Sequence, residues 1–113
     1  MHEYSVVQAL LEQVQELATQ NEATEVTKVI VKIGVMSGVE PHLLEVAFET
    51  FKEKTICQNA HFIMNIQPLV LNCQSCHSKS EVQTAHYCCP QCESLNVNVD
   101  DGEDMYLMSL EML

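Results

Sequence analysis

The sequence predicts an α+β protein of two layers, in which a three-stranded mixed sheet carries two helices on one face and a cysteine-rich insert interrupts the chain. Two segments show the helical recurrence of apolar residues every three or four positions. Three others are rich in β-branched residues or alternate apolar with polar side chains. A sheet covered by two helices would bury the apolar side chains of all five segments.

The first helix is predicted from about Ser5 to Asn21. Its apolar residues recur at spacings of three and four, and glutamines and glutamates occupy the other face. Ser5 and Gln8 resemble a capping box, which places the start of the helix at Ser5. The segment from Val26 to Ile33 follows, and its β-branched residues alternate with two lysines as in a strand.

A second helix is predicted to begin at Pro41, because proline is favoured at the first position of a helix. Its apolar stripe consists of Leu44, Ala47, Phe48 and Phe51. The segment from His61 to Gln67 alternates as a second strand, with Phe62, Met64 and Ile66 on one face. Pro68 marks the end of this strand, since proline cannot donate a hydrogen bond to a sheet.

The third strand of the sheet is predicted from Met105 to Leu113, with its even-numbered side chains on one face. The insert before it contains one segment with strand alternation, Leu95 to Val99. The insert is too short for a core of its own, so we expect a metal to fold it. The expected domains are therefore residues 1–68 with 103–113, and residues 69–102.

Four cysteines form two Cys-x-x-Cys motifs separated by twelve residues. They are Cys73, Cys76, Cys89 and Cys92. Two such turns can direct four thiolates at one point, which suits structural Zn(II) and indicates a zinc-ribbon-like insert. Two disulfides, a redox motif or rubredoxin-type iron are the alternatives. His77 and Glu93 stand where an iron site usually has glycine, and this favours zinc.

Cys88 lies directly before the second motif and makes its register ambiguous. Cys89 gives the same two-residue spacing as the first motif, so we predict Cys89 as the ligand and Cys88 as a spare thiol. His77 is a second alternative, because imidazole also binds zinc and can exchange with a cysteine. A solvated position for His77 is the simpler interpretation.

The formal charge of −11, with five lysines and no arginine, argues against nucleic-acid binding. An acidic surface instead attracts cations and basic protein patches. No apolar run is long enough for a membrane span, and the first residues lack the pattern of a signal peptide. We therefore expect a cytoplasmic protein with reduced cysteines. No nucleophile–base pair or phosphate-binding loop is visible, so we do not expect an enzyme.

The first three residues can form a second metal site. The amine of Met1, the amide and ring nitrogens of His2 and the amide of Glu3 make a square-planar set of four nitrogens. This geometry is typical of Ni(II) or Cu(II), and amide deprotonation makes binding sensitive to protons. A histidine at the second position is more often an ordinary surface residue, so the residues alone leave both interpretations open.

The sequence resembles the HypA/HybF family, the nickel metallochaperones of nickel–iron hydrogenase maturation. The resemblance rests on Met-His-Glu-Tyr-Ser at the start, Ile-Gly-Val-Met-Ser-Gly-Val-Glu-Pro at 33–41, Ala-Phe-Glu at 47–49 and the paired cysteine motifs. It implies a nickel site on His2 with Met1 and Glu3, a structural zinc on the four motif cysteines, and Glu40 near the nickel end. Cys88 departs from the family pattern.

The resemblance also implies the partners and the role. A nickel carrier of this kind works with the nickel-handling GTPase of the pathway and with the hydrogenase large-subunit precursor, and in some bacteria with a urease accessory protein. The alternative is a zinc-ribbon adaptor for protein interactions without a second metal, and a thiol redox protein is a third reading. Alteration of the first residues separates the carrier from the adaptor, because only the carrier needs them.

Overall fold

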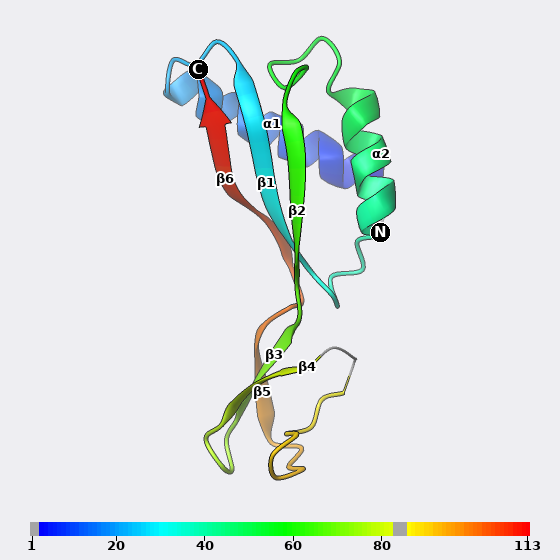
Figure 1. The fold of residues 1–113 in the computed structure, drawn as a ribbon, viewed down its shortest axis with the longest axis vertical. Coiled ribbons are helices and arrows are strands. Elements are labelled where there is room, and N and C mark those ends of the chain that lie inside the picture. Colours follow the sequence, from blue (N-terminus) through cyan, green and yellow to red (C-terminus); the bar gives the residue numbers. More distant parts are fainter. Residues whose placement is uncertain (1–2, 83–85) are drawn as a thin grey trace. The chain divides into compact units, whose positions relative to one another are not determined.

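The computed structural model describes residues 3–82 and 86–113, so the predictions for Met1 and His2 lie outside the described residues. The elements follow in the order α1 (Glu3–Gln20), β1 (Val26–Gly34), α2 (Pro41–Phe51), β2 (His61–Gln67), β3 (Leu69–Cys73), β4 (Lys79–Val82), β5 (Val97–Asp101) and β6 (Met105–Met112). The chain forms two compact units, each with a three-stranded sheet (Figure 1).

The first unit, here called the helical unit, comprises the chain up to Lys32, Val39–Asn65 and Tyr106–Leu113. Its sheet has the strand order β2–β1–β6, and both helices belong to it. The predicted fold class, a three-stranded sheet with two helices and a separate cysteine-rich part, is confirmed. The core of the unit is mostly aliphatic. Its buried side chains include Val7, Leu10, Val14 and Ala18 of α1, Val29 and Val31 of β1, and Leu44, Ala47 and Phe48 of α2.

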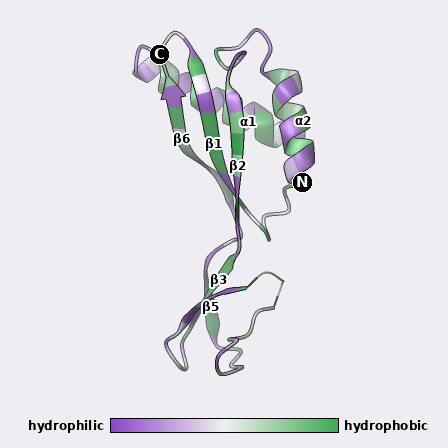
Figure 2. Ribbon diagram, in the orientation of Figure 1, coloured by the Kyte–Doolittle hydropathy of each residue, from purple (hydrophilic) through white to green (hydrophobic). Residues whose placement is uncertain are grey.

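The prediction for α2 is confirmed at its start. Pro41 opens the helix, and the Glu40 side chain caps it by accepting a hydrogen bond from the His42 amide at 3.1 Å. Figure 2 shows alternating hydrophobic and hydrophilic bands along α2, as expected of an amphipathic helix. The ring of Phe48 stacks on Phe62 with a centroid distance of 4.3 Å, which joins the helix to β2.

Two details predicted for α1 and β2 differ from the structure. Ser5 does not cap α1, because the helix already includes Glu3 and Ser5 lies inside its first turn. A glutamate in the first turn is favourable there, since its charge opposes the positive end of the helix dipole. Ile66 was predicted on the face of Phe62 and Met64, but it is 50% exposed, whereas the other two are half-buried.

The second unit, here called the cysteine unit, comprises Ile33–Gly38 and Ile66–Met105. Its sheet has the order β4–β3–β5, with β3 antiparallel to both neighbours. Strands β3 and β4 were not predicted, and the predicted strand from Leu95 begins later, at Val97. The side chains of Leu69, Leu71 and Cys73 are buried, so β3 forms the centre of this small sheet.

Two glycines allow a close backbone approach inside the cysteine unit. A Cβ added at Gly34 would lie 2.4 Å from the backbone carbonyl of Gly102, and one added at Gly102 would lie 2.6 Å from the Leu69 Cα. Gly102 also has a φ of +103°, a conformation that residues with a side chain rarely adopt. Backbone atoms cannot rotate away as side chains can, so both contacts require glycine.

Gly34→Ala is therefore expected to destabilise the cysteine unit by about 3 kcal/mol, since the added methyl group overlaps backbone atoms. Gly38→Ala is the matched control: Gly38 has a φ of +80° but no atom near its Cβ, so only backbone strain of about 1 kcal/mol applies. Denaturant unfolding followed by the amide NMR signals of β3 measures both. Equal losses for the two variants would contradict the proposed steric requirement.

Candidate metal centre

The two Cys-x-x-Cys motifs fold into turns with the same local geometry. In the first turn the Cys73 amide donates to the Ser78 carbonyl at 2.9 Å, and the His77 amide donates to the Cys73 carbonyl at 3.1 Å. In the second, the Cys89 amide donates to the Ser94 carbonyl at 2.9 Å, and the Glu93 amide donates to the Cys89 carbonyl at 2.8 Å. The chain reverses in the same way twice, so each turn presents two thiols in one direction.

The residues after the motifs make these turns possible at some cost. His77 has a φ of 62° and Glu93 a φ of 61°, both in the left-handed region where glycine is normally preferred. The sequence places these two residues at equivalent positions, so the strain is repeated in both turns. Backbone strain of this kind persists where the surrounding structure holds the residue in that conformation, and it is common at functional sites.

The turns bring the four motif sulfurs together. The Sγ atoms of Cys73, Cys76, Cys89 and Cys92 all lie within 4.8 Å of one another. The Sγ of Cys73 is 3.6 Å from that of Cys92, and the Sγ of Cys76 is 3.6 Å from that of Cys89. Four sulfurs around a tetrahedral Zn(II) with bonds of about 2.3 Å would be about 3.8 Å apart. The arrangement therefore fits a zinc ion without rearrangement of the turns.

Backbone amides already point at two of these sulfurs. The amides of Ser75 and Cys76 donate to the Cys73 Sγ at 3.3 and 3.4 Å, and the Gln91 amide donates to the Cys89 Sγ at 3.3 Å. Hydrogen bonds to a ligand from outside the first coordination shell orient it and stabilise its charged form. The cysteine unit thus provides donors for thiolates, which a disulfide would not require.

Two serines that were not predicted from the sequence contribute to the site. The Ser78 hydroxyl lies 2.9 Å from the Cys76 Sγ and 3.5 Å from the Cys89 Sγ, and so connects the two turns. The Ser75 hydroxyl lies 2.9 Å from that of Ser94 and connects them a second time. A signal was available, because both motifs read Cys-x-x-Cys-x-Ser.

The thiols of the cluster differ in acidity. The hydrogen bond from the Ser78 hydroxyl lowers the pKa of Cys89 to about 6, and the amide of Cys76 holds the pKa of Cys73 below its usual value. The Ser94 amide lowers the pKa of Cys92, but the neighbouring Cys73 thiol and burial outweigh it and raise this pKa to about 12. Two positions therefore favour thiolate before any cation neutralises the cluster.

The other cysteines and His77 lie outside the group of four. Cys88 is half-buried, and its Sγ is 3.7 Å from the Nδ1 of His86. Cys57 belongs to the helical unit, where burial raises the pKa of its thiol to about 11. Among the described residues, the group that could hold a metal contains neither Cys88 nor His77.

Of the predicted N-terminal site, only Glu3 lies within the described residues. Its side-chain oxygen accepts a hydrogen bond from the Glu40 amide at 3.2 Å. This bond ties the first turn of α1 to the start of α2, and Glu40 in turn caps α2. The Glu3 side chain therefore lies beside the backbone of Glu40, and the role expected for Glu40 near the nickel end stays a prediction.

The fold and the site together define a metal-binding protein with a zinc-ribbon-like four-cysteine centre joined to a small α+β unit. A family of this kind matches the chain. The family described as "Hydrogenase/urease nickel incorporation, metallochaperone, hypA" matches residues 1–112. The chain therefore belongs to the HypA family, whose members are metallochaperones and not enzymes.

Relatives and solved structures support this membership over the full length. A Hydrogenase maturation factor HypA from Shewanella sp. (strain MR-7) is 54% identical over 112 residues, which cover 99% of this chain and 95% of the relative. A Hydrogenase maturation factor HypA from Aquifex aeolicus (strain VF5) is 51% identical over 112 residues, which cover 99% of this chain and 97% of the relative. The solution structure of the Ni metallochaperone HypA from Helicobacter pylori matches with a TM-score of 0.74 and 36% identity, covering 100% of this chain and 98% of that one.

No helix in the two described ranges is both long and apolar enough to cross a membrane. The resemblance stated from the sequence is confirmed by the comparisons, and so is the expectation of a metallochaperone. The individual nickel and zinc ligands remain predictions.

Proposed function

We propose that this chain carries Ni(II) for hydrogenase maturation, holding the ion at its N-terminus and a structural Zn(II) in the cysteine unit. The observation that carries the proposal is the family match over residues 1–112, which includes both the N-terminal motif and the four cysteines. Nickel is the cargo and zinc the resident ion. The functional division is residues 1–68 with 103–113 for nickel and residues 69–102 for zinc.

The nickel ligands proposed are the amine of Met1, the amide and imidazole of His2, and the amide of Glu3. Four nitrogens suit a square-planar ion, and their protons must leave when it binds. The hydrogen bond between the Glu3 side chain and the Glu40 amide supports this assignment, because it fixes the residue that follows His2. An anchored third residue reduces the conformational freedom lost on binding.

The zinc ligands proposed are the four cysteines whose sulfurs lie within 4.8 Å of one another. When bound, zinc supplies a cross-link that stabilises the folded cysteine unit. The amides that point at Cys73 and Cys89 orient these thiolates, and the Ser78 hydroxyl holds the two turns together. Cys88 stays outside the coordination set as a spare thiol.

The proposed partners are the nickel-handling GTPase of the pathway and the hydrogenase large-subunit precursor, with a urease accessory protein where the cell makes urease. The proposed compartment is the cytoplasm. An acidic chain with a formal charge of −11 is suited to bind cations and basic protein surfaces.

Titration of the tag-free protein with Ni(II), with zinc counted in the same sample, tests the proposal. We expect one exchangeable nickel and one retained zinc per chain, because the two sites use different donors. A weak chelator should remove the nickel and leave the zinc. Retention of one zinc without any nickel uptake would instead support the zinc-ribbon adaptor.

A further inference from the structure

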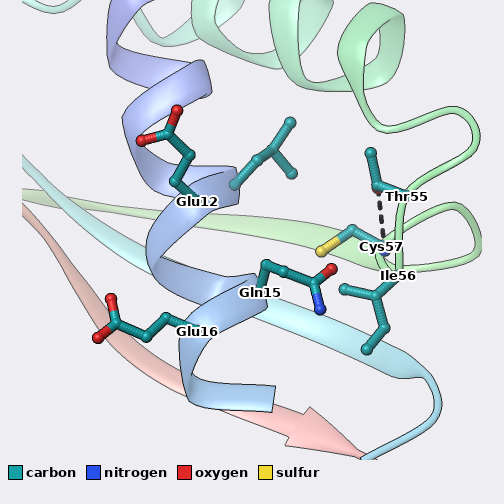
Figure 3. A pocket seen from close by; sticks show the side chains of 7 residues that line it. Glu12, Gln15, Glu16, Thr55, Ile56 and Cys57 are labelled. Atoms are coloured by element: carbon teal, nitrogen blue, oxygen red, sulfur yellow. Dashed lines mark hydrogen bonds between the residues drawn. The ribbon is translucent and has the colours of Figure 1, made fainter. Parts of the chain in front are cut away.

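A groove in the helical unit has no part in either proposed metal site. It lies between α1 and the loop that joins α2 to β2 (Figure 3). Its volume is about 410 Å³, within the range of roughly 300–1,000 Å³ found for ligand pockets. Leu11, Ile56 and the buried Cys57 form its apolar part, and Glu12 and Glu16 line it on the α1 side.

The loop wall of this groove is held in place by the protein. The Thr55 hydroxyl accepts a hydrogen bond from the Cys57 amide at 3.1 Å and donates one to the Lys52 carbonyl. The Ile56 carbonyl accepts a hydrogen bond from the Val26 amide at 3.1 Å, which attaches the loop to β1. A groove that is already formed lets a ligand bind without the cost of ordering its walls.

The charge around the groove has one sign. Glu12 and Glu16 are four residues apart on α1, so they lie on one side of the helix, and both are exposed. Neither forms an ion pair within the described ranges, and α1 contains no lysine or arginine. The adjacent loop contributes Lys52, Glu53 and Lys54. Lys52 pairs with Glu49 of α2 at 2.7 Å, and the charges of Glu53 and Lys54 cancel. The groove therefore combines an apolar floor with an unneutralised acidic rim.

We propose that this groove binds a segment of a partner protein that inserts an apolar side chain against Leu11 and Ile56 and places lysines or arginines beside Glu12 and Glu16. An acidic rim around an apolar site favours a basic amphipathic segment, because the charges speed encounter and select the partner. A second copy of this chain is disfavoured, since each copy has a formal charge of −11. The proposal does not depend on the nickel cargo.

The test uses the zinc-loaded full chain without nickel and two synthetic helical peptides. Both peptides carry leucines at three- and four-residue spacings; one has lysines at the other positions and its matched partner has glutamates. Amide NMR shifts locate the bound peptide, and fluorescence anisotropy gives the dissociation constant. We expect the lysine peptide to bind with shifts confined to α1 and the loop around Thr55, and the glutamate peptide not to bind.

Two variants examine the rim and the floor separately. Glu12→Lys with Glu16→Lys should weaken binding of the lysine peptide by about tenfold or more, since two attractions become repulsions. Gln15→Trp should block it by filling the groove, because Gln15 is exposed and lines it. Glu45→Lys with Glu81→Lys changes the net charge equally at exposed positions outside the groove lining, and should leave affinity within about twofold.

Three outcomes would overturn the proposal. Equal weakening by both charge-reversal pairs would show general attraction to an acidic protein and not a site. Binding of the two peptides with equal affinity would show that the occupant is apolar and not basic. A dimer in sedimentation experiments that Gln15→Trp dissociates would show that the groove is filled by a second copy. Localised binding lost only in the groove variants supports the proposal.

Discussion

Cys73→Ala is expected to remove the zinc ion and to unfold the cysteine unit while the helical unit stays folded. Zinc stabilises small structural domains by apparent binding free energies of about 10–16 kcal/mol, so its loss exceeds the stability of such a unit. The buried apolar side chains of the cysteine unit are few, chiefly Ile33, Leu69, Val70 and Leu71. The helical unit has its own core and contains none of the four cysteines.

Metal analysis and two-dimensional NMR of the same sample check this expectation. Zinc content should fall from one per chain to near zero, and the amide signals of β3, β4 and β5 should collapse to unfolded positions. The signals of α1 and α2 should be retained. Cys88→Ser is the matched control, since it removes a neighbouring thiol outside the cluster, and it should keep both zinc and fold. Full zinc retention in Cys73→Ala would show that the four sulfurs are not the ligand set.

The helical unit was largely predictable because its segments carry local signals. The two helices have apolar stripes, Pro41 marks the start of the second, and β1 and β2 alternate. The start of α1 was misjudged because Ser5 and Gln8 imitate a capping box, whereas the contact of Glu3 is with Glu40, far away in the sequence. A contact between residues so far apart in the sequence produces no local sequence pattern from which it could be predicted.

The four clustered cysteines of the cysteine unit could be predicted from the sequence, but its strands β3 and β4 could not. Nearly every residue of β3 is buried, so Leu69–Cys73 has no alternation of apolar and polar residues. β4 is only four residues long, and its sequence Lys-Ser-Glu-Val has no distinct strand signal. Its pairing with β3, such as Leu71 opposite Ser80, depends on the chain reversal at the first cysteine turn. The groove beside Cys57 was likewise not foreseen, because segments distant in sequence form it.

His2→Ala is expected to lower the affinity for Ni(II) by more than about 100-fold without changing the zinc content. The imidazole is one of four proposed nitrogen ligands and the one that anchors the ion while the amides lose their protons. Removal of even a supporting residue around a metal typically costs 10–100-fold in affinity. Calorimetric titration of the tag-free variant, with zinc measured in parallel, gives the comparison. His42→Ala and His61→Ala are the controls, since both histidines are exposed and outside the proposed site.

Acetylation of the Met1 amine is expected to have an effect as large, although it removes no side chain. It converts the amine into an amide that no longer offers a basic nitrogen, so the chelate loses its terminal ligand. This modification separates a chelate that depends on the free amine from a site made of side chains alone. Unchanged nickel affinity in the acetylated protein would contradict the N-terminal site while leaving the zinc assignment intact.

The same chelate determines how nickel binding should depend on pH. The amine, the imidazole and the two amides bind nickel only without the protons that compete for them, so lower pH should weaken binding. A carrier with this property holds its ion at neutral pH and releases it when protons or a stronger ligand compete.

In cells, the His2→Ala variant should therefore fail to support hydrogenase maturation at limiting nickel, whereas His42→Ala should support it. Normal maturation with His2→Ala under nickel limitation would show that delivery does not use the N-terminal site.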